Sequence, residues 1–209
     1  MSDFKEVKAN TNSISKRKLV LGVGVNDSYY ITDRTINGKR MRCPYYMKWL
    51  SMLSRCYNEK YQARQPTYAG ATVCKEWLTF SVFKAWMIDQ EWQGKDLDKD
   101  IINPGNKHYS PDSCCFVSGR INALLNNCSS SRGEYPQGVN FNKQRGKYQA
   151  YCNYAGKIKH LGRFKTVNAA SLRYRLFKSQ LVRKLAQKQT DERIEHGLMQ
   201  HAKLILYGA

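Results

Sequence analysis

The stretch from Gly138 to Gly162 constrains the fold of this chain more than any other part of the sequence. Polar and apolar residues alternate in it, and two turn signals interrupt it, Gln144-Arg145-Gly146 and Ala155-Gly156. This pattern predicts three strands over residues 138–142, 147–154 and 157–162. Alternation puts part of the middle strand on a face that suits a core, namely Tyr148, Ala150 and Cys152. The opposite face is then polar and comprises Lys147, Gln149, Tyr151 and Asn153.

A long helix is predicted directly after these strands. Thr166 is a suitable N-cap, and helical spacing continues to about Lys188. One side of this helix is apolar and the other is cationic, so we expect its apolar side to cover the sheet. The fold class predicted for this region is a three-stranded antiparallel sheet backed by a long helix, within an α+β protein.

Charge is concentrated in the same region. The 209 residues include 35 Lys and Arg against 16 Asp and Glu, a net charge of +19. Residues 134–188 hold 13 of the basic residues and a single acid, Glu134. A surplus of this size favours a polyanionic partner, because Lys and Arg release the counterions condensed on phosphates. Membrane surfaces and acidic proteins are the other targets that such a charge permits.

The landmarks of this region also resemble those of a known family. They occur in order over about a quarter of the chain: Gly138-Val139, Gly146-Lys147-Tyr148, Ala150, Gly156-Lys157, Leu161-Gly162, Phe164, Thr166, Ala169-Ala170 and Tyr174. They are similar to the plant ethylene-response-factor (Apetala-two) type of DNA-binding domain, which also occurs in phage and mobile-element proteins. In that family the three-stranded sheet lies in the major groove. The resemblance implies that these residues face bases or phosphates: Asn140, Asn142, Arg145, Lys147, Gln149, Tyr151, Asn153, His160 and Arg163.

The sequence departs from the plant pattern at several of these positions. Asn140, Asn142 and Asn153 stand where arginines are usual, and His160 stands where tryptophan is usual. A base preference therefore does not carry over from the family. The simpler interpretation of the same residues is a basic, solvated sheet face without a partner.

The first part of the chain reads as a mostly helical module over residues 19–127. We expect a flexible tail over 1–18, short strands over 19–25 and 29–32, and helices over 45–57 and 76–88. Small polar residues around 128–134 predict a linker to the basic domain of 135–189. Residues 190–209 are predicted to form a further helix, with Ile194, Leu198, Leu204 and Ile205 packing back.

A second resemblance lies near residues 96–127. Leu97-Asp98-Lys99-Asp100-Ile101, Gly105-Asn106, Tyr109 to Cys114 and Arg120-Ile121-Asn122 resemble the ββα-metal (HNH) nuclease finger of phage homing endonucleases. The resemblance implies that Asp98 and Asn122 hold a divalent cation, Mg²⁺ or Mn²⁺, beside the scissile phosphate. Lys99 occupies the place of the general-base histidine, so the finger is degenerate. Lys99 as a phosphate clamp and His108 as a substitute base are the alternatives, and a capped turn is the simplest interpretation.

The remaining sequence features narrow the class of protein. The seven cysteines form no CxxC pair, so zinc is not expected and buried thiols are the better account. No run approaches the ~20 apolar residues that cross a bilayer, and the N-terminus lacks the apolar segment of a signal peptide. We therefore expect an intracellular protein, in the bacterial cytoplasm if a phage encodes it, and make no prediction of its oligomeric state.

Three functions remain open from the sequence. The first is a sequence-preferring DNA endonuclease in which the finger cuts and the basic domain locates the site. The second is a DNA-binding or regulatory protein that has the same architecture without catalysis. The third is an RNA-binding protein, because tyrosines interleaved with basic residues can stack on unpaired bases. Whether the chain is an enzyme is left open at this stage.

Overall fold

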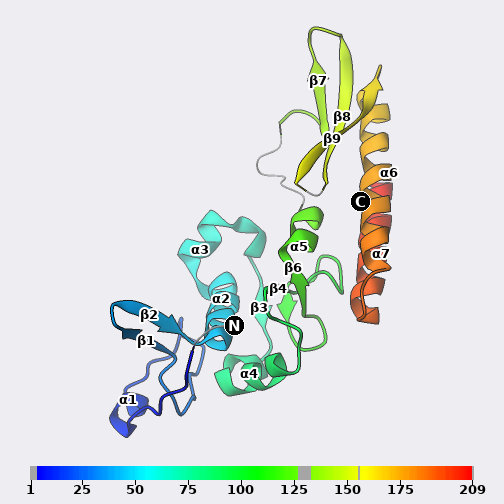
Figure 1. The fold of residues 1–209 in the computed structure, drawn as a ribbon. Helices are drawn as coiled ribbons and strands as arrows, with labels where there is room; N and C mark the ends of the chain where they lie inside the picture. The colour runs from blue at the N-terminus through cyan, green and yellow to red at the C-terminus, as the bar shows by residue number, and fades with distance from the viewer. Residues whose placement is uncertain (1–3, 127–132, 155, 209) are drawn as a thin grey trace. The chain divides into compact units, whose positions relative to one another are not determined.

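The computed structural model of the chain describes residues 4–126, 133–154 and 156–208 (Figure 1). It is an α+β structure that divides into two compact units, Met1–Ser118 and Gly119–Ala209. This division falls earlier in the chain than the linker predicted over 128–134, most of which lies outside the described residues. In the described part, no helix is long and apolar enough to span a lipid bilayer.

The core of the first unit lies between its helices. These are α2 (Pro44–Tyr57), α3 (Glu59–Arg64) and α4 (Phe80–Ile88), with short 3-10 turns η1 (Pro66–Tyr68) and η2 (Glu76–Leu78) between them. Proline at the first turn of α2 fits there because that position needs no donated hydrogen bond. Trp49 is fully buried, and its indole Nε1 donates to the carbonyl oxygen of Trp77 at 2.7 Å. The helices predicted over 45–57 and 76–88 are confirmed, the second one in two pieces.

The strands predicted over 19–25 and 29–32 are wrong. Leu21 and Gly22 have positive φ angles of 53° and 77°, so the chain reverses there and forms only isolated bridges. Gly24 lies so close to the core that a Cβ would be 2.5 Å from Leu53 Cδ1. The regular strands begin later, as the antiparallel hairpin of β1 (Asp33–Ile36) and β2 (Lys39–Arg42). Its turn at Asn37-Gly38 has positive φ at both residues, which suits a two-residue hairpin.

The described part of the predicted N-terminal tail is packed. It contains α1 (Thr11–Ser15), which Asn10 caps through its side-chain oxygen. Arg17 then donates from its guanidinium to the carbonyl oxygens of Asn26, Ser28 and Tyr30. These contacts join Arg17 to residues 9 to 13 positions later in the chain. Local composition does not reveal such contacts, so it predicts a flexible tail where the chain is folded.

Two short pairs of strands complete the first unit. β3 (Thr72–Val73) pairs in parallel with β5 (His108–Tyr109), and β4 (Lys95–Asp98) pairs antiparallel with β6 (Cys115–Ser118). Helix α5 (Gly119–Leu125) follows β6 directly in the chain and belongs to the second unit. The strand–strand–helix order predicted near residues 96–127 is therefore present.

The second unit contains the predicted sheet and helix. Strands β7 (Val139–Asn142), β8 (Lys147–Tyr154) and β9 (Lys157–Phe164) form an antiparallel sheet in the order β7-β8-β9, with β8 central. Helix α6 (Val167–Ala186) packs against it, and the Oγ1 of Thr166 accepts from the backbone N–H of Ala169 at 3.2 Å. Both the three strands and the cap are confirmed.

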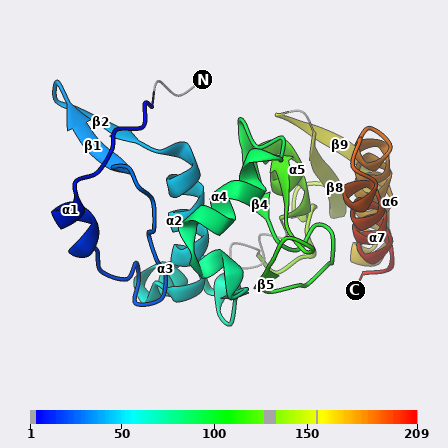
Figure 2. The same ribbon diagram turned by 90° about the horizontal axis from the view of Figure 1, so that it is seen from below.

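The last helix, α7 (Glu192–Tyr207), lies along α6 in both views (Figures 1 and 2). The two run antiparallel, because Arg175 donates to Leu206 O and Ser179 to Ala202 O. Of the residues predicted to pack back, Ile194 and Leu198 are buried, whereas Leu204 is 39% exposed. The sheet therefore covers one part of the α6 surface and α7 another.

Candidate functional site

The outward face of the β7-β8-β9 sheet carries the predicted DNA-facing residues. Cross-strand partners share a face, and the register pairs Gln149 with Asn140 on one side and with Arg163 on the other. The same rule adds the pairs Asn142–Lys147, Tyr151–His160 and Asn153–Ile158. Arg145 lies in the turn between β7 and β8. The sheet thus brings together all nine predicted residues, one of them at its turn.

A β-bulge in β9 is needed for this arrangement. Ala150 pairs with Gly162, but the next residue of β8, Tyr151, pairs with His160. Leu161 is therefore an extra residue in β9, and it packs toward the core of the unit instead. Without the bulge, His160 and Arg163 would lie on opposite faces, because they are three residues apart.

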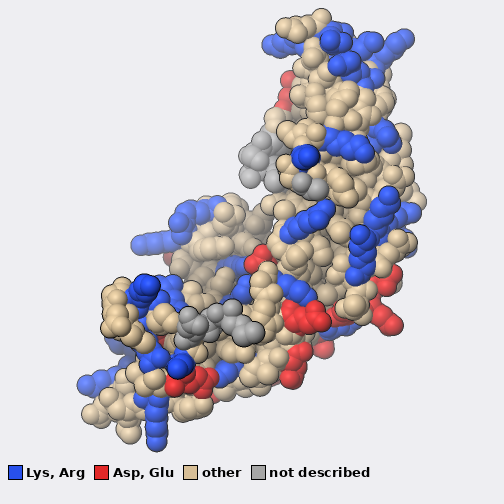
Figure 3. All heavy atoms as spheres, in the orientation of Figure 1, with Lys and Arg blue, Asp and Glu red and all other residues tan. Residues whose placement is uncertain are grey.

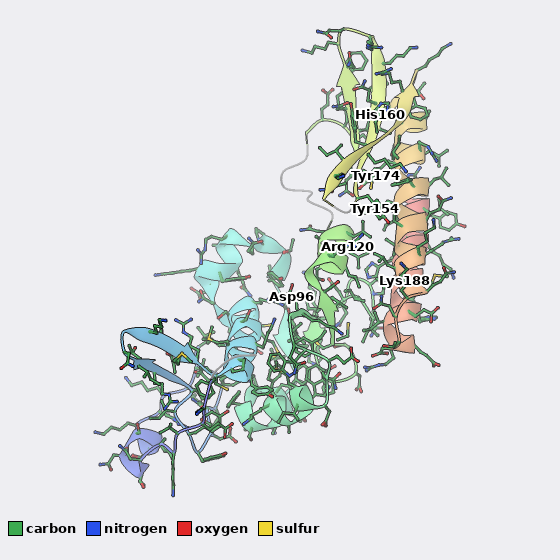
Figure 4. All side chains as sticks on the ribbon, viewed as in Figure 1. Asp96, Arg120, Tyr154, His160, Tyr174 and Lys188 are labelled. Carbon is green, nitrogen blue, oxygen red and sulfur yellow. The ribbon has the colours of Figure 1, made fainter. Side chains whose placement is uncertain are left out.

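Two residues of this face are already engaged. Gln149 is buried, and its Oε1 accepts a hydrogen bond from the hydroxyl of Tyr151 at 2.5 Å. The Oδ1 of Asn142 accepts from the backbone N–H of Arg145 at 3.0 Å and so orders the turn. The ring of His160, labelled on β9 in Figure 4, lies 5.2 Å from the Tyr151 ring. The side chains of Gln149 and Asn142 are therefore used within the sheet and its turn, where they stabilise the shape of this face.

Five side chains of the face are exposed and make no hydrogen bond or ion pair within the residues that the structure describes. They are Asn140, Arg145, Lys147, Asn153 and Arg163. Figure 3 shows Lys and Arg gathered over this sheet and the adjoining part of α6, with little acidic surface in that view. These cations and amides are therefore available to contact an external group, and cations and amides of these types can bind anions.

The opposite face of the same sheet is closed by α6. Ala150 and Ala170 are both fully buried, and Tyr174 of α6, labelled in Figure 4, lies so close to Gly138 that a Cβ there would be 2.1 Å from its ring. Lys159, although basic, pairs with the buried Cys152, and its Nζ lies 4.9 Å from the centre of the Phe177 ring on α6. Basic residues of β8 and β9 are thus divided between a packed face and an open one.

Sequence reasoning missed one member of the open face, Ile158. Its side chain is 76% exposed and shares the outward face with Asn153, its partner in the register. Residues two apart in a strand share a face, so Ile158 could have been predicted from its position two residues before His160.

The predicted nuclease finger has its own geometry around Asp98. The Oδ1 of Asp98, at the end of β4, accepts from the backbone N–H groups of Asp100 and Ile101, both at 2.8 Å. Burial, together with the nearby Asp100 carboxylate, raises the pKa of Asp98 to about 7. Asp98 therefore caps a turn, and its carboxyl group exchanges a proton near neutral pH.

Lys99 and His108 are both held by neighbours. Lys99 is buried, and its Nζ lies 3.2 Å from Asp100 Oδ2. His108 lies on strand β5, not in a loop as predicted, and its Nδ1 is 2.8 Å from the hydroxyl of Thr72. Asn106 joins the two segments, because its Nδ2 donates to the carbonyl oxygens of Lys99 and His108, both at 2.7 Å.

The predicted metal ligands lie in different units. Asp98 belongs to the first unit, whereas Asn122 is a half-buried residue of α5 in the second. Over residues 4–126, 133–154 and 156–208 no group of three or more His, Cys, Asp or Glu side chains is arranged to hold a metal ion. Burial raises the pKa of Cys56 and Cys114 to about 12, so these thiols stay protonated in the core. Cys128 lies outside the described residues.

Comparisons with protein-family models, with curated proteins and with solved structures found no match to this chain.

Proposed function

We propose that this protein binds double-stranded DNA through the outward face of the β7-β8-β9 sheet. One observation carries the proposal: Lys147 and Arg163 extend from adjacent strands to one exposed face, together with amides that lack internal partners. Cations in this position release counterions when they meet phosphates, and amides can hydrogen-bond base edges. The major groove, about 12 Å wide, admits strands as well as helices.

Salt-dependent binding to a short duplex tests the proposal. The double variant Lys147→Ala, Arg163→Ala should lower the slope of log K against log salt by about 2 units, close to 0.9 for each lost phosphate contact. Its thermal midpoint should stay that of the wild type, because neither side chain has a partner within the described structure. Fluorescence anisotropy at several salt concentrations measures the slope.

Lys159→Ala is the matched control, since Lys159 lies on β9 but faces α6. It removes a lysine of the same sheet and should leave the slope nearly unchanged. An equal loss of slope in the control and in the outward-face variant would remove this face from the interface. If single-stranded RNA competes more strongly than the duplex, the partner is RNA and not double-stranded DNA.

A second candidate function is metal-dependent cleavage of the bound DNA. The observations that favour it are the β4-β6-α5 order of the finger and the paired carboxylates of Asp98 and Asp100. Carboxylate oxygens suit Mg²⁺ or Mn²⁺, and a cation there would relieve the repulsion from Asp100 that adds to burial in raising the pKa of Asp98. Such an ion, when bound, supplies a Lewis acid for a phosphate oxygen. Against this, the ammonium group of Lys99 already lies beside Asp100.

Incubation with supercoiled plasmid separates the two functions. Metal-dependent nicking that EDTA stops and Asp98→Ala abolishes would support cleavage. Asp96→Ala is the control, because Asp96 lies on the same strand with an exposed carboxylate and should cut like the wild type. Unimpaired cutting by Asp98→Ala would sink the assignment, and a gel shift without nicking would leave DNA binding alone.

A further inference from the structure

The pair Asn153 and Ile158 is the least expected feature of the outward face. A single exposed isoleucine is ordinary on a protein surface. Ile158, however, lies directly opposite Asn153 in the register, on the face that also carries Lys147 and Arg163. The exposed Asn153 amide has no hydrogen-bond partner within the described part of the chain. An apolar group and an unpaired amide are thus held side by side on adjacent strands.

The chemistry of the two side chains matches that of one type of base pair. Residues directly opposite each other on antiparallel strands have Cα atoms about 4.5–5.5 Å apart. In the major groove an A·T pair presents N7 and N6 of adenine beside O4 and the methyl group of thymine. An asparagine amide pairs with the adenine edge, and an apolar side chain contacts the methyl group.

We propose that Asn153 and Ile158 read A·T base pairs in the major groove. Asn153 hydrogen-bonds adenine, and Ile158 packs on the 5-methyl group of thymine. This inference rests on the proposed function, and it assigns a preference within it. The amide side chains of Gln149 and Asn142 do not compete for this role, because each is already bonded within the sheet.

Three short duplexes test the reading of thymine: alternating dA–dT, alternating dA–dU and alternating dG–dC. Uracil differs from thymine only by the missing methyl group. The wild type should bind dA–dT about fourfold more tightly than dA–dU, the effect of burying one methyl group, and dG–dC least. Ile158→Ala should bind dA–dT and dA–dU equally. Leu172→Ala, which removes an exposed leucine of α6, should keep the wild-type ratio.

The adenine contact has a separate test. Replacing adenine by 7-deazaadenine in the dA–dT duplex removes the N7 acceptor and should weaken wild-type binding by about fivefold or more. Asn153→Ala should be weakened on the unmodified duplex and should show no further loss on the modified one. A loss of equal size in Asn153→Ala and in the wild type would overturn the role of Asn153.

The outcomes separate this inference from the function beneath it. Equal wild-type affinity for dA–dT and dA–dU, or tighter binding to dG–dC, would overturn the A·T reading and leave duplex binding intact. Failure to bind any of the three duplexes would overturn the proposed function as well. Ile158 is exposed, so its variant should fold as the wild type does, and circular dichroism checks this.

Discussion

The basic residues on the outward face of the second unit differ in their bonding from three basic residues of the first unit. In the first unit, Arg17, Arg55 and Lys48 donate to backbone carbonyl oxygens, and each thereby stabilises the fold. On the outward face of the second unit, Lys147 and Arg163 make no such bond within the described residues. The contrast teaches that net charge alone does not show which cations the fold has left without an internal acceptor.

The cores differ as well. The first unit is built on large aromatic side chains and contains all four tryptophans, Trp49, Trp77, Trp86 and Trp92. The second contains no tryptophan; four of its alanines, Ala150, Ala170, Ala186 and Ala202, are fully buried beside a cluster that includes Tyr174 and Leu181. Tryptophan fluorescence therefore reports on the first unit alone, and the stability of the two units can be measured separately.

Gly138→Ala should give the largest effect and confine it to the second unit. Gly138 has a φ angle of 76°, and a Cβ there would lie 2.1 Å from Tyr174 Cδ2 and 2.6 Å from Tyr151 O. Both the conformation and the clash oppose alanine, so we expect a loss of about 4 kcal/mol or more in the free energy of unfolding. Amide hydrogen exchange in β7 and β8 should rise sharply while tryptophan emission stays unchanged.

Gly146→Ala is the control for that experiment. Gly146 also has a positive φ angle, 59°, but a Cβ there would meet nothing within 4 Å. Only the conformational cost remains, about 1 kcal/mol. If both variants lose stability equally, the close contact between Gly138 and Tyr174 does not hold the second unit together.

Arg17→Ala should give the next largest effect, in the first unit. The change removes the donor that Ser28 and Tyr30 share and leaves the carbonyl oxygens of two buried residues without it. We expect a loss of about 2–3 kcal/mol, measured by urea unfolding followed through tryptophan emission. The salt dependence of DNA binding should not change. Lys16→Ala, which removes a neighbouring exposed cation, should leave stability within about 0.5 kcal/mol of the wild type.

Asp98→Asn should give the smallest effect, and it should raise the free energy of unfolding where the preceding variants lower it. The unfolded carboxyl group titrates near 3.8 and the folded one near 7. Between these values the folded state keeps a proton that the unfolded state has released, so Asp98 lowers the free energy of unfolding progressively as pH rises from about 4 to about 7. The amide removes this loss and retains an acceptor for the N–H groups of Asp100 and Ile101.

The expected gain for Asp98→Asn is about 1–2 kcal/mol at pH 8, falling away toward pH 4. Urea unfolding at pH 4, 6 and 8 measures it, and Asp96→Asn on the same strand provides the baseline. A variant less stable than the wild type at pH 8 would contradict the raised pKa of Asp98.

The parts of the fold that sequence predicted are those with local causes. The three strands follow from alternation and two turns, and the start of α6 follows from the hydroxyl of Thr166. The errors have non-local causes. The reversal at Leu21 and Gly22 accompanies the packing of Gly24 on α2, and the contacts of Arg17 reach residues 26–30.

The candidate site, like the fold, could be predicted only in part. Its membership came from the family resemblance, and the register of β7, β8 and β9 places the strand residues on one face. The roles of its residues could not be predicted, because the bond between Gln149 and Tyr151 and the exposure of Ile158 depend on the folded sheet and not on residue type. Residue type alone does not separate an amide that shapes the sheet from one that remains available.

The extra residue in β9 has a consequence for how this surface can change over time. Substitutions on the outward face change one side chain each, so this surface can be adjusted step by step. Deletion of Leu161 would remove the bulge and its packing but would leave His160 opposite Tyr151, on the same face as Arg163. Deletion of Lys159 would instead shift the residues before it in β9 by one position and turn Ile158 to the opposite side of the strand. A codon lost on that side of the bulge would thus alter the surface more than a point mutation, whereas loss of the extra residue itself would keep the composition of the face.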